Sequence, residues 1–238
     1  SSDLTDYHES GPPGSLALLL WMEADRLDTL GREIDQAKLD LQRDVVRNER
    51  RQSIENVPYG KVELRMPELL YPDAHPYHHP VIGSHEDLEA ARVEDVRAFF
   101  AKYYVACIAA LVVAGDVTVD DAKALAKRYF GHLPAQKRPE RAQPSAPPPL
   151  GKVVRETMED KVELAKVTYA FHAPAHLAPG DADLDLLAAV LSSGKSSRLY
   201  KALVYDKPLA QSVSASQGSA HLSSVFTIEA TARPGVSL

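Results

Sequence analysis

The chain has almost no cysteine, no long apolar run and no block of basic residues. One cysteine among 238 residues, Cys107, excludes an internal disulfide. Because it lies in the apolar run 107–113, we expect it to be buried as a small hydrophobic side chain. The longest apolar run, residues 103–114, is shorter than the roughly 18 residues that a membrane span needs. The sequence therefore favours a chain without an integral membrane segment.

The charge balance also excludes one class of partner. The formal net charge is −6, and an acidic chain without a lysine- or arginine-rich block is not expected to bind nucleic acid. What the sequence does contain is 45% hydrophobic and 25% charged residues. A chain of this length and composition can bury a sizeable core, as one large domain or as two small ones.

A long amphipathic helix is predicted over residues 34–55. Ile34, Leu41 and Val45 recur at helical spacing and form its expected buried face. Glu49 follows Val45 by about one turn, so its carboxylate is expected at the edge of the core, where it could bind a metal ion.

A second interpretation of Glu49 is a surface ion pair. Arg47, Arg50 and Arg51 are its neighbours in the sequence, and a glutamate on an arginine-rich helix commonly pairs with one of them. The pattern of residues by itself leaves both interpretations open.

The order of several short motifs favours one of the two interpretations of Glu49, the metal ligand. The segment Val46-Arg47-Asn48-Glu49 resembles part of the pitrilysin/insulinase family of zinc metallopeptidases, as do the three motifs around it: Trp21-Met22-Glu23-x-Asp25-Arg26-Leu27, His75-Pro76-Tyr77 and Ile82-Gly83. In that family an inverted His-x-x-Glu-His motif supplies two zinc ligands and the general base, and a glutamate on a later helix supplies the third ligand. The resemblance implies that Glu49 is this third ligand.

The same resemblance implies an activity. The intact protein would be a zinc metalloendopeptidase that holds one zinc ion and hydrolyses peptides inside a closed chamber of two domains. The catalytic motif would lie upstream of Ser1, so the 238 residues are expected to be an internal piece of a longer chain, with no catalytic residue of their own. We expect this piece alone to be inactive and to bind no catalytic zinc.

Three histidines, His75, His78 and His79, suggest a second metal site. The prolines among them keep the backbone extended, which spreads neighbouring imidazoles, and no cysteine or acidic cluster accompanies them. We expect this segment to pack the loop after the ligand helix and to bind no metal.

Three positions depart from the family pattern. Members usually carry an arginine and, seven residues later, a tyrosine that contact the bound peptide, and these positions are Val204 and Gln211 here. Many members also carry a second glutamate where this chain has Gln42. These departures favour an alternative, a non-catalytic partner subunit of a heteromeric peptidase, and a homodimer or a heterodimer is possible in either case.

A proline-rich stretch, residues 140–151, reads as a linker. It separates residues 1–139, the latter part of a first peptidase-like domain, from residues 152–238, the start of a second. The fold class is α+β, with two similar units that each contain an antiparallel-rich sheet covered by helices on one face. By resemblance the compartment would be the bacterial periplasm or the cytoplasm, and the sequence selects neither.

Strands and helices are assigned from apolar periodicity, caps and breakers. The expected strands are residues 4–10, 107–114, 153–158, 165–171, 209–217 and 223–232. Besides residues 34–55, the expected helices are residues 15–31, 60–70, 84–91, 93–104, 118–130, 182–191 and 198–204.

Overall fold

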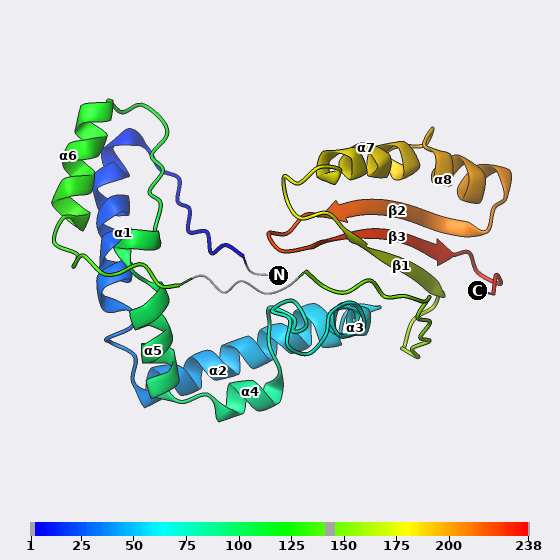
Figure 1. Cartoon of the computed structure of the whole chain (residues 1–238), viewed down its shortest axis with the longest axis horizontal. Helices are drawn as coiled ribbons and strands as arrows, with labels where there is room; N and C mark the ends of the chain where they lie inside the picture. The colour runs from blue at the N-terminus through cyan, green and yellow to red at the C-terminus, as the bar shows by residue number, and fades with distance from the viewer. Residues whose placement is uncertain (1–2, 141–145, 238) are drawn as a thin grey trace. The chain divides into compact units, whose positions relative to one another are not determined.

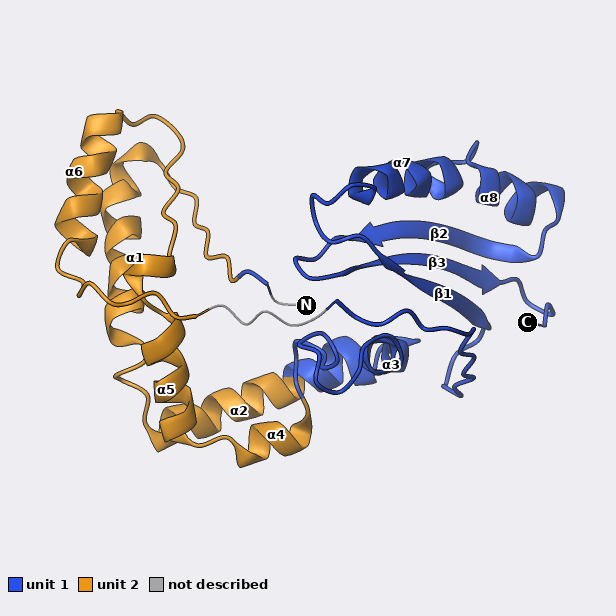
Figure 2. Cartoon of the chain, viewed as in Figure 1, with its two compact units in different colours: residues 1–4, 49–83, 143–238 blue, residues 5–48, 84–142 orange. Residues whose placement is uncertain are grey.

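The computed structural model describes residues 3–140 and 146–237. The chain divides into two compact units, shown in Figure 2. Unit 1 contains residues 1–4, 49–83 and 143–238, and unit 2 contains residues 5–48 and 84–142. Residues 141–145 of the predicted linker lie outside the described residues. The domain boundaries at residues 139 and 152 stay a prediction.

The regular structure in the described residues of unit 2 is helical, and segments without regular structure join the helices. The two short turns in this unit are η1 (Pro13–Ser15) and η3 (Ala106–Ile108), and the helices are α1 (Leu16–Thr29), α2 (Gln36–Arg50, which continues into unit 1), α4 (His85–Ala90), α5 (Val93–Tyr103) and α6 (Val119–Phe130). Leu20 and Ala24 are the buried residues of α1. Gly31 follows this helix where a Cβ atom would lie 2.5 Å from the Cβ of Phe100, so a larger residue would push α5 away.

The helix starts of unit 2 follow from local chemistry. The Ser84 hydroxyl accepts a hydrogen bond from the Asp87 amide at 2.9 Å, and the Thr118 hydroxyl accepts one from the Asp121 amide at 3.1 Å. Both are side-chain caps of otherwise unpaired helical amides. The starts of α4 and α6 predicted from these residues are confirmed.

Unit 1 is built on an antiparallel sheet of three strands, β1 (Lys166–Ala173), β3 (Ser224–Ala232) and β2 (Ala210–Gly218), in that spatial order. The helices are α3 (Gly60–Leu70), α7 (Asp181–Ser192) and α8 (Arg198–Tyr200), with π turns η2 (Arg51–Glu55) and η4 (Lys201–Asp206). Figure 1 shows α7 and α8 along one side of the sheet and α3 along the other. The Ser192 hydroxyl fastens α7 to β2, because it accepts a hydrogen bond from the Ala215 amide at 2.8 Å.

The core of unit 1 lies where the end of α3 meets the sheet. Leu70, Tyr71 and Tyr77 are buried there and pack against Ala170 on the edge strand β1 and Val225 on the central strand β3. Alternation along β1 explains this packing: Ala170 points to the α3 side, while its neighbours Tyr169 and Phe171 are 56% and 50% exposed.

A buried carboxylate joins the start of α7 to the end of β2. Asp181 is 5% exposed and accepts hydrogen bonds from Gln217 Nε2 at 3.0 Å, Ser219 Oγ at 2.7 Å and the Leu177 amide at 2.9 Å. These bonds, with that from Gln217 first, lower the pKa of Asp181 to about 2. The carboxylate therefore stabilises the fold in its ionised form.

We expect the stability contributed by Asp181 to disappear in acid. The pKa of Asp181 is lower in the folded chain than in the unfolded chain, so its contribution to stability is complete above about pH 4 and is lost as the pH falls toward 2. Over that range the equilibrium constant for folding should decrease by at most about tenfold per pH unit. Asp181→Asn should be less stable than the unchanged protein at pH 7, and the difference should narrow in acid. Urea unfolding at several pH values measures this, and a difference that stays constant with pH would contradict it.

Three predicted strands are wrong. Residues 4–10, 107–114 and 153–158 run without sheet pairing among the described residues. Backbone amides in an extended segment form a strand only when a neighbouring segment accepts their hydrogen bonds, and no described segment does so here. Val112 is 85% exposed as a result. Cys107 lies in the turn η3 and is exposed, so the prediction that it is buried is also wrong.

The α+β class is confirmed by the helices of both units and the antiparallel sheet of unit 1. All the strands in the described residues belong to that one sheet, so a second sheet expected before the linker is not formed by them. Among the same residues, no helix has the length and apolar character required to span a membrane.

Candidate functional site

Glu49 lies in the last turn of α2, and its side chain is exposed. Its backbone carbonyl accepts a hydrogen bond from Ser53 Oγ at 2.6 Å. Within the described part of the chain, no ion pair is formed by the Glu49 carboxylate. Both carboxylate oxygens are therefore available to a ligand outside the helix.

The helix is turned differently from the sequence prediction. Leu39 is its buried apolar residue, and the Arg43 guanidinium donates to the carbonyls of Leu88 at 2.7 Å and Ala91 at 2.8 Å, so the arginine face packs beside α4. Leu41 and Val45, expected in the core, are 68% and 49% exposed. The prediction of a buried Leu41/Val45 face is wrong because the hydrogen bonds of the Arg43 guanidinium bring the opposite face of the helix inward.

The arginines next to Glu49 are engaged with other carboxylates. Arg47 NH1 lies 3.4 Å from Glu89 Oε1, and Arg50 Nε lies 2.7 Å from Glu55 Oε1. These two contacts remove most of the support for a local ion pair at Glu49. Sequence reasoning missed the Arg50 contact, although Glu55 follows Arg50 by five residues, the spacing of one π turn.

A zinc ion accepts carboxylate oxygen as a ligand, and the exposed carboxylate of Glu49 fits that role. A catalytic site needs about three protein ligands. The described residues hold no group of three histidine, cysteine or acidic side chains that could bind a metal ion. The described residues thus offer Glu49 as one candidate carboxylate ligand and contain no complete metal site.

The segment with the three histidines packs against Tyr71 and Tyr77. His75 is 5% exposed, stacks on the Tyr71 ring with centroids 4.7 Å apart, and accepts a hydrogen bond at Nδ1 from the Tyr77 amide at 3.1 Å. Burial, followed by the electrostatic interaction with nearby His172, lowers the pKa of His75. His78 Nδ1 lies 2.7 Å from the Tyr71 carbonyl. The packing role expected of this segment is confirmed.

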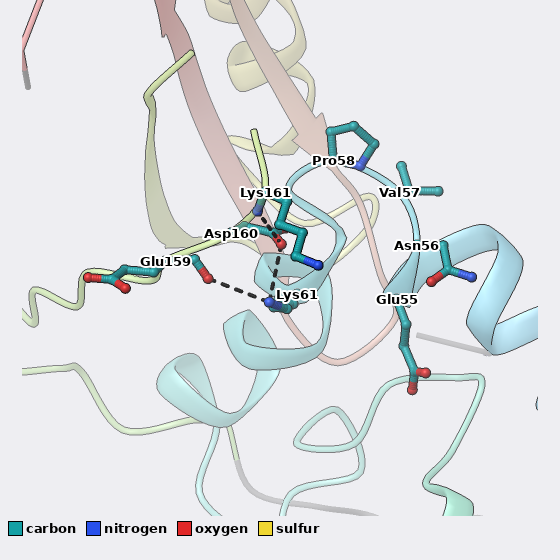
Figure 3. Close-up of a pocket in the computed structure, with 8 residues that line it drawn as sticks. All are labelled: Glu55, Asn56, Val57, Pro58, Lys61, Glu159, Asp160 and Lys161. Carbon is teal, nitrogen blue, oxygen red and sulfur yellow. Dashed lines mark hydrogen bonds and ion pairs between the residues drawn. The ribbon is translucent and has the colours of Figure 1, made fainter. Parts of the chain in front are cut away.

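A pocket of about 570 Å³ opens beside the start of α3. Figure 3 shows its lining, which comes from the η2–α3 turn and from residues that follow the linker: Glu55, Asn56, Val57, Pro58, Lys61, Glu159, Asp160 and Lys161. The Lys61 ammonium lies 3.1 Å from the Asp160 carboxylate. A hydrogen bond from the Lys161 amide, followed by that from Lys61, lowers the pKa of Asp160. The paired charges of this pocket serve to hold its two walls together.

Further contacts tie the same segment to α3. Arg65 Nε lies 3.0 and 3.1 Å from the two carboxylate oxygens of Glu156, and the Tyr59 hydroxyl donates to the Leu164 carbonyl at 2.8 Å. These bonds replace the strand pairing that was predicted for residues 153–158.

The two positions of the family's peptide-contacting residues lie close to β2. Val204 is in η4, and its carbonyl accepts a hydrogen bond from Arg233 NH2 at 3.1 Å. Gln211 is the extra residue of a bulge in β2, between Ala210, which pairs with Ala232, and Ser212, which pairs with Thr231. Bulges commonly redirect a side chain at functional sites. A bulge of this kind is therefore present at Gln211, although the side chain there is not the tyrosine that the family resemblance implies.

The chain is similar to proteins of known class. Residues 90–237 match the family model described as the peptidase M16 inactive domain. The zinc protease PqqE of Helicobacter pylori is 30% identical over 240 residues, which cover 99% of this chain and 53% of that protein. The chain thus spans about half the length of this relative.

Solved structures agree with this similarity. A protease from Helicobacter pylori matches with a TM-score of 0.84 and 28% identity, over 94% of this chain and 54% of that one. A peptidase M16 inactive domain from Pseudomonas fluorescens matches with a TM-score of 0.71 and 20% identity, over 84% and 48%. Pitrilysin matches with a TM-score of 0.65 and 18% identity, over 92% and 24%. The last two show the fold alone.

The family model covers more than half of the chain, and the motifs that resemble pitrilysin and insulinase lie on the elements described above. The chain belongs to the M16 family, the pitrilysin/insulinase family of peptidases.

Proposed function

We propose that the chain is part of a zinc-dependent metalloendopeptidase and that Glu49 is a ligand of its zinc ion. The observation that carries this proposal is the exposed Glu49 carboxylate, which forms no ion pair with the described residues while Arg47 and Arg50 pair with Glu89 and Glu55. The relative named as a zinc protease aligns with nearly the whole chain, including this helix.

In this proposal the chain supplies one ligand and a surface for the peptide. The His-x-x-Glu-His motif does not occur in the 238 residues, so the two histidine ligands and the general base would come from residues outside this sequence. Bound zinc would lower the pKa of its water and polarise the scissile carbonyl. Glu49 would hold one coordination position and contribute negative charge that offsets the charge of the ion.

The proposed substrate is a peptide in extended conformation. The strands β1 and β2 are the two edges of the sheet in unit 1, and an edge strand offers unpaired amides and carbonyls to an added strand. Such pairing favours short unfolded peptides over folded proteins, which agrees with a chamber closed by two domains.

The second candidate function is that of a non-catalytic partner subunit. Gln42, Val204 and Gln211 stand where the family pattern has glutamate, arginine and tyrosine, and the matched family model is described as an inactive domain. A partner subunit would keep the sheet and the bulge at Gln211 and would lack bound metal. A homodimer or a heterodimer fits either proposal.

Peptide hydrolysis by the full-length protein tests the proposal. We expect hydrolysis of unstructured peptides, loss of activity and zinc together on dialysis against a chelator, and recovery of both when zinc is returned. The 238-residue chain alone should remain inactive with or without zinc. A metal-free, inactive full-length protein that stimulates a second subunit would instead establish the partner role.

A further inference from the structure

Glu49 precedes a change in helix geometry. The α-helical turns of α2 end at Arg50, and the next five residues form the π turn η2, in which the Asn56 amide donates to the Arg51 carbonyl at 2.8 Å. Short π turns often accompany functional sites. The helix continues without a break through η2 to Glu55, so Glu49 stands where the hydrogen-bond spacing of the helix changes and not at a free helix end. A metal ligand at this place needs something that keeps the turn fixed.

Arg50 fixes this turn from another face of the helix, about 100° around the axis from Glu49. Its side chain is 14% exposed, and its Nε donates to Glu55 Oε1 at 2.7 Å, across the π turn. The NH1 group of the same guanidinium donates to the carbonyl of Gly83. One side chain therefore joins the end of α2, the end of η2 and a loop 33 residues away in the sequence.

The loop contact depends on an unusual backbone. Gly83 has a φ of +73°, in the region that favours glycine, and its amide closes a turn by donating to the Pro80 carbonyl at 3.0 Å. On the other side of η2, a Cβ atom at Gly60 would lie 1.9 Å from the Ile54 carbonyl oxygen. One glycine, Gly60, thus lies against the π turn, and Arg50 reaches a second, Gly83.

We propose that Arg50, through Glu55 and the Gly83 carbonyl, is the positioning residue that holds Glu49 in the orientation required for zinc binding. The inference rests on the proposed function and adds a residue to it. Consecutive residues of a helix point about 100° apart. Arg50 can therefore point into the protein while Glu49 points outward, and holding the backbone at Arg50 also sets the direction of the Glu49 Cα–Cβ bond.

The planar guanidinium is suited to this task. It presents several N–H donors at fixed angles and can bond to Glu55 and Gly83 at the same time. A lysine has a single ammonium group at the end of a flexible stem, so it cannot reproduce both directions. Arg50→Lys should keep the charge and lose the positioning.

Arg47 is a matched control. It lies three residues earlier on α2 and pairs with Glu89 at 3.4 Å, with side-chain exposures of 27% and 66%. An ion pair this exposed contributes little to rigidity. Arg47→Gln removes the same charge from the same helix without touching η2 or Gly83.

The experiment compares four variants of the full-length protein: Arg50→Gln, Arg50→Lys, Glu55→Gln and Arg47→Gln. We expect zinc affinity, measured by chelator competition, to fall by about 10-fold or more in the first three, as when supporting partners of metal ligands are removed, and to stay unchanged in the fourth. In the zinc-free protein, amide hydrogen exchange over residues 46–55 should become faster in the first three only. In peptide hydrolysis, kcat should fall while KM is unchanged.

The outcomes separate the two proposals. Unchanged zinc affinity and exchange in Arg50→Lys and Glu55→Gln would overturn the positioning role, even if Glu49→Gln still abolishes zinc binding. Zinc that stays bound in Glu49→Gln would instead overturn the ligand assignment. Should Arg50→Gln fail to fold, Arg50→Lys and Glu55→Gln decide the question by the same measurements. An equal loss of affinity in Arg47→Gln would show a general effect of helix charge and would also overturn the proposal.

Discussion

Glu49→Gln is expected to remove zinc and peptidase activity together from the full-length protein. The change keeps the size of the side chain and replaces a charged ligand by a neutral amide, which binds zinc poorly. Removing partners that merely support a ligand already weakens metal affinity by about 10- to 100-fold. Loss of the ligand itself should exceed about 100-fold. Zinc content after chelator washing and kcat/KM on an unstructured peptide measure the two losses.

The folded state should survive this substitution. The Glu49 side chain is exposed and forms no ion pair with the described residues, so the urea midpoint of the zinc-free protein should not change. Asp44→Asn removes another exposed carboxylate from α2 and should leave zinc in place. Full zinc occupancy in Glu49→Gln would eliminate the ligand assignment.

Tyr71→Ala is expected to destabilise unit 1 by about 3–5 kcal/mol, the usual cost of deleting a buried aromatic side chain. Tyr71 is 6% exposed, stacks on His75 and meets the rings of Tyr77 and His172 edge-on at 5.5 and 5.3 Å. Its loss would remove the ring that contacts the three-histidine segment and β1 at the end of α3. Urea or thermal unfolding of the protein measures the change.

Two further tyrosine variants show whether the burial of Tyr71 causes the loss of stability expected for Tyr71→Ala. Tyr71→Phe keeps the ring and loses only a long hydrogen bond to the Ser223 carbonyl at 3.4 Å, so it should cost less than about 1.5 kcal/mol. Tyr169→Ala removes a ring that is 56% exposed in the same unit and should cost much less than Tyr71→Ala. Equal losses in Tyr71→Ala and Tyr169→Ala would refute a core centred on Tyr71.

Local features were predictable from the sequence. The caps at Ser84 and Thr118 depend on residues three positions apart, and the bounds of α3 agree with the predicted residues 60–70. The strands of the sheet in unit 1 were also found, and in β1 and β3 the signal is a high content of β-branched and aromatic residues. In these segments the information that determines the structure lies within a few neighbouring residues.

Features that depend on distant partners were not predictable. The apolar run 107–114 has strand composition, yet a strand requires a neighbour that the run itself does not specify. The Arg50 contact joins residues 50 and 83, and no pattern in either segment shows that they meet. Glu49 was identified as a candidate ligand by family resemblance, since its local sequence is equally compatible with an ion pair.

The division of the chain into interleaved segments affects how it must fold during synthesis. Tyr71 and Ser223, joined in the core of unit 1, are 152 residues apart in the sequence. At about 5–20 residues per second, the ribosome needs roughly 8 to 30 s to make the second after the first. Throughout that interval the apolar side chains of Leu70, Tyr71 and Tyr77 have no sheet to cover them, so nascent chains of this protein should depend on chaperones that bind exposed hydrophobic segments until β3 has emerged.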